Sequence, residues 1–497
     1  MRYFYLLLPF IVLINALAAK AQNWSTPVNV SNMGKHCNAP RMIVDHSGTI
    51  HAVWSLMITQ QYRKIMYAKS ENQGDTWSVP IAIANDSSQW FDGTDIACDL
   101  QNRLYVSYEG DDMAPSTTSI YMTIFDGSQW STPSIISVNM YGSNNSIVVS
   151  DNAGRVYCFW HNWYNNEVKL IYKYLEDGLW SQSIIPYTQN GEFFWIKKIV
   201  ADSANNLHCV GTHHYNDESR YDDRVIYCYY LRSSNQWAPI ENISDTINYS
   251  WHGSDICLDN QQVPHFVWGQ FLNPYPNPVT NNATLYRFPN ESGWLPVDSV
   301  EVDHNSHNHQ LVIDKTNQSN ICVNQWTNVP NQPSNSYLVN YRNINNIWIG
   351  EEIDSITPGA FYEPQLISLG DENIGVIYYK GGVSNDTVLD IHFSKYNIFT
   401  NIKPNELSAI NMLITPNPFT TQTEISYTVN TQCQVLLDIF DINGKLITRL
   451  TDQTQSPGQY CILWQGVGAN AKEVSKGLYF VRLQAGSNVY TCKIAKQ

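Results

Sequence analysis

Short runs of alternating apolar and polar residues, separated by Asp, Asn, Gly and Ser, fill the chain between residues 22 and 397. Alternation with a period of two is typical of β-strands that bury one face, and the separating residues favour tight turns. One unit consists of APRMIVDHSGTIHAVW at residues 39–54 and KIMYAKSENQGDTWSVPIAI at residues 64–83, which together hold four such runs. The pattern predicts an all-β protein built from repeated sets of antiparallel strands.

The unit recurs about every fifty residues and carries one tryptophan per copy. A last copy, EPQLISLGDENIGVIYYK with TVLDIHFSKYN, ends before its tryptophan strand, whereas NWSTPVNVS at residues 23–31 matches QWSTPSIISV at residues 129–138. Because one such sheet cannot bury both faces, the copies must stack around an axis. We predict a seven-bladed β-propeller over residues 22–397, closed by the N-terminal strand. Successive tryptophans lie 53, 53, 50, 57, 57 and 54 residues apart: Trp24, Trp77, Trp130, Trp180, Trp237, Trp294 and Trp348.

The first residues are typical of an export signal. Arg2 precedes an almost wholly apolar run at residues 3–17, and residues 19–21 form an A-x-A cleavage site. The apolar run is short for a membrane span and ends in small residues, as signal peptides do. We expect residues 1–21 to be removed, and we expect no transmembrane segment in the mature protein.

Residues 70–77, SENQGDTW, resemble the Asp-box, S-x-D-x-G-x-T-W, of the sialidase superfamily, with Asn72 in place of the aspartate. FDGSQW at residues 125–130 and LEDGLW at residues 175–180 are shortened versions. In such a hairpin a side-chain oxygen binds backbone N–H groups, glycine takes a positive φ, and tryptophan packs between blades. The resemblance supports a propeller fold, and because these boxes are structural it implies no particular chemistry.

After Asn397 the repeat ends, and residues 398–411 are expected to form a linker. Residues 412–497 resemble the type IX secretion sorting domain of Bacteroidetes, with ITPNPF, NGKLI, SKGLYFVRL and KIAK in order. The resemblance implies a small antiparallel β-sandwich recognised by the type IX machinery, and a protein secreted or held at the outer-membrane surface of a Gram-negative bacterium. The family's positions are occupied by Pro416, Asn417, Pro418, Gly444, Lys445, Gly477, Tyr479 and Lys493.

Composition narrows the choice of partner. The net charge of −15 argues against nucleic acid, which requires a basic surface. Ten cysteines are present without a C-x-x-C pair, and those in strand-like runs are expected to be small buried apolar residues. The histidines of HNSHNH, His304, His307 and His309, match no strong metal motif, so no metal site is predicted. No motif identifies a cofactor.

One face of the propeller is expected to carry the function. The loops opposite the Asp-boxes hold many His, Arg, Tyr and Trp residues, and function concentrates in loops held by a rigid scaffold. Aromatic rings beside His and Arg suit sugar rings that carry carboxylate or sulfate. The candidate ligand-binding residues are Arg41, Trp163, Tyr164, His213, Arg220, Trp251, His252, His309 and Tyr362.

Three kinds of function fit this face. The first is a non-catalytic propeller that binds glycan or protein, favoured because no motif requires catalysis. The second is a polysaccharide lyase acting on uronic-acid glycans, as in some seven-bladed propellers with degenerate boxes. Its chemistry needs a base for a proton beside a carboxylate and a cation for that carboxylate. In that case His214 or Tyr215 is base or acid and Arg224 binds the carboxylate. His161 would face them from the preceding blade.

The third kind is a sialidase or another glycoside hydrolase. The sialidase family uses an arginine triad, a Tyr–Glu pair and an acidic Asp. Here the F-R-I-P start is missing, since Arg41 follows Pro40, and Tyr362 and Glu363 are adjacent, so in an extended segment they point to opposite faces. Sialidase catalytic domains have six blades, in contrast to the seven predicted here. We therefore regard this function as the least favoured, and whether the protein is an enzyme stays open.

Overall fold

The computed structural model divides into two compact units, Met1–Ile398 and Phe399–Gln497. Strands, turns and bends make up the ordered elements, and the described part of the chain contains no helix that could cross a membrane. The residues described are 23–59, 62–84, 91–111, 118–138, 142–164, 167–187, 193–217, 220–244, 253–271, 282–327, 335–344, 347–357, 359–370, 373–381, 388–396, 412–429, 432–441, 445–469, 472–485 and 488–496.

The first half of unit 1 folds into consecutive antiparallel sheets whose strands follow chain order, except that β18 of the fourth sheet pairs with β16. The first sheet contains β2 (Cys37–Val44), β3 (Ile50–Thr59), β4 (Tyr62–Ser70) and β5 (Ile81–Ala84). The second contains β6 (Phe91–Cys98), β7 (Leu104–Asp111), β8 (Thr118–Phe125) and β9 (Ser134–Ile135). The third contains β10 (Ser143–Ser150), β11 (Val156–Tyr164), β12 (Glu167–Glu176) and β13 (Leu179–Trp180). The fourth contains β14 (Phe193–Ala201), β15 (Leu207–Asp217), β16 (Arg220–Leu231), β17 (Gln236–Trp237) and β18 (Glu241–Asn242).

The second half contains a seven-stranded sheet and a four-stranded sheet. The larger sheet contains β19 (Asp255–Leu258), β20 (Pro264–Phe271), β21 (Asn282–Arg287), β24 (Asp298–Ile313), β25 (Ser319–Thr327), β26 (Asn335–Ile344) and β27 (Ile347–Ile356). The last sheet contains β28 (Ala360–Gly370), β29 (Asn373–Gly381), β30 (Asp390–Tyr396) and β1 (Val28–Asn29). The short strands β22 (Pro289–Asn290) and β23 (Gly293–Trp294) form a separate hairpin.

The long strand β24 belongs to two sets of strands. Its first part pairs with β21, from Asp298 opposite Tyr286 to His304 opposite Asn282. Its second part pairs with β25, ending with Ile313 opposite Ser319. β24 is therefore the outermost strand of one set and the innermost strand of the next.

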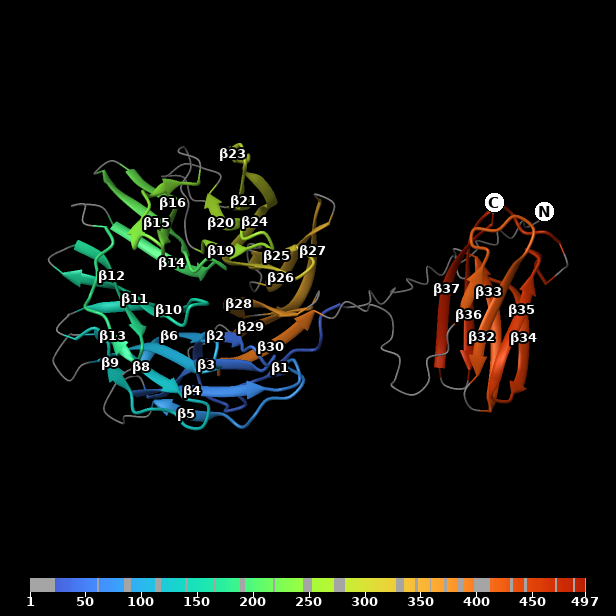
Figure 1. Cartoon of the computed structure of the whole chain (residues 1–497), viewed down its shortest axis with the longest axis horizontal. Coiled ribbons are helices and arrows are strands. Elements are labelled where there is room, and N and C mark those ends of the chain that lie inside the picture. The colour runs from blue at the N-terminus through green and yellow to red at the C-terminus, as the bar shows by residue number, and fades with distance from the viewer. Residues whose placement is uncertain are drawn as a thin grey trace, which may run out of the picture. The chain divides into compact units, whose positions relative to one another are not determined.

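The innermost strands of unit 1 lie around a common centre, and their sheets extend outward from it (Figure 1). Along the chain β2 contacts β6, β6 contacts β10, β10 contacts β14, β14 contacts β19, β19 contacts β24 and β24 contacts β28, which in turn contacts β2. Apolar clusters fill the spaces between neighbouring sheets; in one of them Tyr157 and Phe159 pack with Cys209 and Tyr230. The expected burial of cysteines in strands is confirmed for Cys98, Cys158, Cys209, Cys228 and Cys322, whereas Cys257 is only partly buried; all six are free.

The start of unit 1 is bound to its end. β1 pairs with β30, with Val28 opposite Phe393, and an isolated bridge joins Trp24 to Tyr396. The Trp24 side chain is only 3% exposed, and its ring lies 5.4 Å from the Tyr396 ring in an edge-on contact. The N-terminal segment thus completes the sheet of β28, β29 and β30.

The turn at residues 70–77 works as its sequence predicts. The Asn72 side-chain oxygen accepts a hydrogen bond from the Thr76 backbone N–H at 2.9 Å, and the Ser70 hydroxyl accepts one from the Gly74 N–H at 2.8 Å. Gly74 has a φ of +86°, and the Trp77 ring lies 5.4 Å from Phe393 of the last sheet. The hairpin is stabilised locally and packs between sheets.

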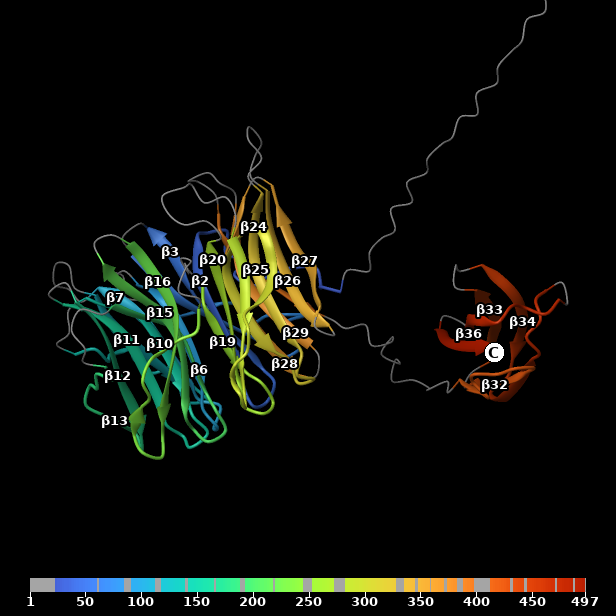
Figure 2. The same cartoon turned by 90° about the horizontal axis from the view of Figure 1, so that it is seen from above.

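Unit 2 consists of two antiparallel sheets that share one apolar core. In Figure 2, β32 lies on one side of this unit and β33 and β36 lie on the other. Residues from both sheets meet in the core, including Ile425, Val435 and Trp464. One sheet contains β31 (Leu413–Thr415), β32 (Thr423–Val429) and β35 (Gly458–Trp464), and the other contains β34 (Leu446–Gln455), β33 (Cys433–Asp441), β36 (Gly477–Ala485) and β37 (Asn488–Lys496).

Candidate functional site

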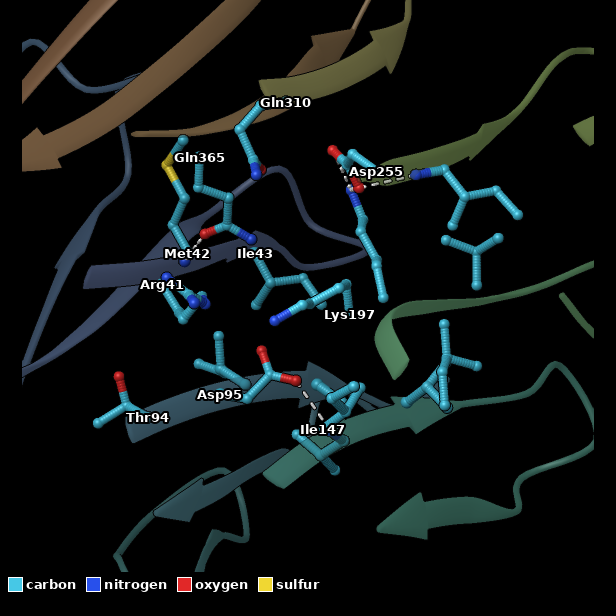
Figure 3. A pocket seen from close by; sticks show the side chains of 18 of the residues that line it. Arg41, Met42, Ile43, Thr94, Asp95, Ile147, Lys197, Asp255, Gln310 and Gln365 are labelled. Atoms are coloured by element: carbon cyan, nitrogen blue, oxygen red, sulfur yellow. Dashed lines mark hydrogen bonds and ion pairs between the residues drawn. The ribbon is translucent and has the colours of Figure 1, made fainter. Parts of the chain in front are cut away.

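A cavity of about 840 Å³ lies at the centre of unit 1. Residues of the innermost strands β2, β6, β10, β14, β19, β24 and β28 line it, and Figure 3 shows several of their side chains directed toward the middle. The fold therefore brings together polar residues that are far apart in the sequence.

Bulges in the innermost strands set which side chains reach the cavity. The pairing register shifts between Asn38 and Arg41 in β2 and between Asp92 and Asp95 in β6. Equivalent shifts occur in β10, β24 and β28. An extra residue of this kind redirects the side chains that follow it. Arg41 and Asp95 follow such bulges and line the cavity. Positive φ angles mark the bulges at Ala39, Gly93, Asn145, Asn308 and Glu363.

The carboxylates in the cavity bind neighbouring strands together. Asp255 lies 2.8 Å from the Lys198 ammonium and accepts the Leu311 backbone N–H at 2.7 Å. Asp95 accepts the Val148 backbone N–H at 2.8 Å, which joins β6 to β10. Burial raises the pKa of Asp95, and the nearby Arg41 charge only partly opposes this effect.

Two further cations reach the cavity, Arg41 and Lys197 (Figure 3). The Arg41 guanidinium is half-buried and lies 3.7 Å from the Glu363 carboxylate. Lys197 is an exposed residue, and partial desolvation of its ammonium by the surrounding protein lowers the pKa of that group. The Lys197 nitrogen lies 5.9 Å from the centre of the Trp195 ring, so this cation and an aromatic side chain lie close together in the cavity lining.

Aromatic side chains cluster where the β10–β13 sheet meets β14. The Trp195 ring lies 4.9 Å from the His161 ring and 6.0 Å from the Trp163 ring. Trp163 is 47% exposed, whereas His161 is fully buried and its Nε2 accepts the Ile196 backbone N–H at 3.0 Å. Burial, with the Lys197 charge as a smaller cause, lowers the pKa of His161 to about 3. His161 is therefore neutral near neutral pH.

His213 and Arg224 extend this cluster from the β15–β16 hairpin. The two residues are directly opposite each other in a register that runs without irregularity from Leu207 to Asp217. Cys209 and Cys228 of the same strands pack toward the β10–β13 sheet. Alternation with a period of two places His213 and Arg224 on that same face. The space between the two sheets thus holds His213 and Arg224 as well as His161 and Trp163.

The structure brings part of the predicted catalytic set together. His161, His213 and Arg224 share one space between sheets, but the burial of His161 and its backbone hydrogen bond give no support to a proton-transfer role. The hairpin pairing continues through His214, Tyr215 and Arg220, while their side chains, like that of Tyr164, lie outside the described residues. Trp251 and His252 lie outside them altogether.

The two remaining binding candidates, His309 and Tyr362, and the other histidines of HNSHNH lie elsewhere. The buried His309 ring contacts the Thr284 hydroxyl at 3.2 Å. A Cβ atom at Gly269 would lie 2.4 Å from this ring, so the ring occupies space that is available because residue 269 is glycine. Tyr362 stacks on Tyr379 with ring centres 5.0 Å apart. His307 packs edge-on against Trp326, and the His304 side chain lies outside the described residues. In the described part of the chain no group of three or more His, Cys, Asp or Glu residues is placed to hold a metal.

The expectation that the candidate residues lie in loops needs correction. Arg41 is in β2, His161 in β11, His213 in β15 and Tyr362 in β28. These strands continue past the apolar runs because their backbone pairing does not depend on apolar side chains. Sequence reasoning missed Lys197 and Asp95, although two consecutive lysines in the apolar strand FFWIKKIVA were a usable signal.

Comparison with known proteins identifies the C-terminal part. Residues 413–497 match the family of the secretion system C-terminal sorting domain, so the protein is secreted or attached to the cell surface. No curated protein matches the sequence.

Among solved structures, the chain is similar to a polysaccharide lyase of family PL25, an ulvan lyase bound to -[GlcA(1-4)Rha3S]-. The TM-score is 0.52 at 13% identity, over 74% of this chain and 95% of that chain. The polysaccharide lyase Uly1 gives a TM-score of 0.48 at 9% identity, over 74% and 90% of the two chains. The NanB sialidase of Streptococcus pneumoniae gives 0.40 at 12% identity, over 76% and 71%. The first likeness shows that unit 1 shares the fold of that lyase.

Proposed function

We propose that unit 1 is a seven-bladed propeller closed by β1, and that the protein is exported by the type IX machinery to bind polysaccharide. The contacts of the innermost strands in sequence, with β28 against β2, support the ring. The two sets of strands that share β24 each count as one blade. The pairing of β1 with β30 supplies the last outer strand.

The exposed Trp163 beside Trp195 carries the proposal of polysaccharide binding. A ring that is 47% exposed next to a second indole offers an apolar surface on which a sugar ring can stack. Polar groups lie beside this pair, because His161 and Lys197 are 4.9 Å and 5.9 Å from the Trp195 ring. The fold is shared with a lyase bound to a glucuronate-containing oligosaccharide, which supports a carbohydrate ligand.

A binding titration with acidic and neutral polysaccharides tests this proposal on the full chain. Trp163→Ala should weaken binding of the ligand about tenfold or more, because truncating a stacked aromatic anchor costs about 1.4 kcal/mol or more. Leu179→Ala is the matched control, since Leu179 is 77% exposed in β13 and lies outside the cluster. Equal affinities of Trp163→Ala and the unmodified chain, or no binding to any polysaccharide, contradict the proposal.

A polysaccharide lyase is the second candidate, favoured by the register of the β15–β16 hairpin. His213 lies opposite Arg224, and the next rungs of the same pairing carry His214 and Tyr215. In this function Tyr215, two positions after His213 along β15, removes the proton beside a uronate carboxylate and returns it to the departing glycosidic oxygen, and Arg224 stabilises the negative charge that develops. The glycosidic bond then breaks by elimination and leaves an unsaturated uronate.

Product analysis separates the candidates. New reducing ends together with ultraviolet absorbance of an unsaturated uronate indicate a lyase, and Arg224→Met should then abolish both signals. Reducing ends without that absorbance indicate a hydrolase, including the sialidase alternative. Binding without any product leaves the non-catalytic function.

A further inference from the structure

Charged and aliphatic side chains both line the central cavity. Arg41, Asp95 and Lys197 are among its charged residues (Figure 3). Aliphatic residues such as Ile199 and Leu311 also line it. A ligand in the cavity therefore meets charged groups from several of the innermost strands.

The acidic groups of the cavity already have partners. Asp255 pairs with Lys198, and Glu109 accepts the Asn145 backbone N–H at 2.6 Å. Asp95 accepts the Val148 backbone N–H, and burial raises its pKa. Glu363 faces Arg41 at 3.7 Å. Within the described residues none of these carboxylates forms an ion pair with Lys197.

Lys197 is the cationic residue of the cavity lining that is not paired with any of these carboxylates in the described part of the chain. Within the described ranges its ammonium has no ion pair, and desolvation alone accounts for the lowered pKa. Lys197 is exposed, so an anion can reach its ammonium from solvent, and a hydrogen bond between these charged groups is stronger than one between neutral groups. The site is therefore suited to a negatively charged ligand.

We infer that Lys197, assisted by Arg41, binds an acidic substituent of the polysaccharide, a carboxylate or a sulfate ester, and makes the protein selective for anionic glycans. This inference rests on the proposed function. Lys197 lies 5.9 Å from the Trp195 ring, which contacts Trp163. A sugar stacked on the exposed indole can thus direct its acidic group to the cavity. Lys197 is a specificity-determining residue in this account and has no role in bond breaking.

Affinity measurements on the full chain test the inference with three probes: a uronate polysaccharide, its carboxyl-reduced derivative, and a sulfated polysaccharide without uronate. The unmodified protein should bind at least one anionic polymer about tenfold more tightly than the reduced polymer, which corresponds to about 1.4 kcal/mol. Lys197→Met should remove this preference and keep the weaker binding. Lys69→Met is the control, because it removes the same charge from a side chain that is 44% exposed and paired with Glu71.

Each outcome bears on a different claim. Loss of preference for the uronate polymer identifies a carboxylate, and loss for the sulfated polymer identifies a sulfate. An unchanged preference in Lys197→Met, or an equal loss of affinity for charged and reduced polymers, overturns the inference while the proposed function stands. Failure of the unmodified protein to bind any probe counts against the proposed function itself. A melting temperature of Lys197→Met close to that of the parent chain verifies folding, because the exposed Lys197 forms no ion pair with the described residues.

Discussion

Replacement of Trp24 by alanine tests how strongly the N-terminal segment holds unit 1 together. The indole is 3% exposed and packs in a cluster with Leu338, Ile353 and Tyr378, besides its edge-on contact with Tyr396. Truncation of a buried tryptophan to alanine costs about 3–5 kcal/mol, because transfer energy is lost and a cavity is left. The aromatic contact contributes about 0.5–1.5 kcal/mol to such a loss. We expect Trp24→Ala to lower the free energy of unfolding by about 3–5 kcal/mol.

Urea unfolding and calorimetry of the full chain measure this change. Thr26→Ala is the control, because Thr26 is exposed in the same segment, and its effect should stay within about 0.5 kcal/mol. Deletion of residues 22–31 should be more severe, since it also removes the β1–β30 pairing and the buried Val30. If Trp24→Ala costs less than about 1 kcal/mol, well below the range for buried aromatic residues, the N-terminal segment does not secure the last sheet.

Two further predictions concern stability. Gly74→Ala should destabilise the protein by well over about 1 kcal/mol, because its Cβ would lie 2.0 Å from the Phe393 ring. The control Gly48→Ala should cost only about 1 kcal/mol, because Gly48 has the same φ of +86° and no atom within 4 Å of the added Cβ. Equal losses of stability in chemical denaturation would show that the contact with Phe393 is unimportant. Burial lowers the pKa of six described histidines below the unfolded value of about 6.5, so their contribution is complete above that pH and declines as the pH falls toward about 4. The melting temperature should therefore drop between about pH 7 and about pH 5, and a constant or rising value there would contradict this reasoning. The histidines are His51, His161, His208, His265, His307 and His392.

The repeat made the strands of unit 1 predictable from the sequence. The match between residues 23–31 and residues 129–138 predicted a strand at the N-terminus, and β1 is found beside β30. The type of hydrogen bonding in the SENQGDTW turn was predictable because its hydrogen bonds join residues within a few positions of each other. Local patterns therefore carried this part of the prediction.

The candidate site was predictable only in its residue types. His213 and Arg224 were identified as candidates, but the sequence did not show that they lie opposite each other on paired strands. The ends of these strands are polar, so the apolar pattern does not reveal how far the hairpin pairing extends. Lys197 was missed because a bulge decides whether a side chain enters the cavity, and alternation of residue types does not reveal a bulge. Its neighbour Lys198 pairs instead with Asp255, 57 residues further along the chain, a contact that only the arrangement of sheets creates.

The most direct test of the central claim is a titration of the full chain and Trp163→Ala with the panel of acidic and neutral polysaccharides, in which bound ligand and released products are measured together. The account predicts that the unmodified protein binds an acidic polysaccharide and that Trp163→Ala binds it about tenfold more weakly or worse. A folded protein that binds none of these polysaccharides would contradict it.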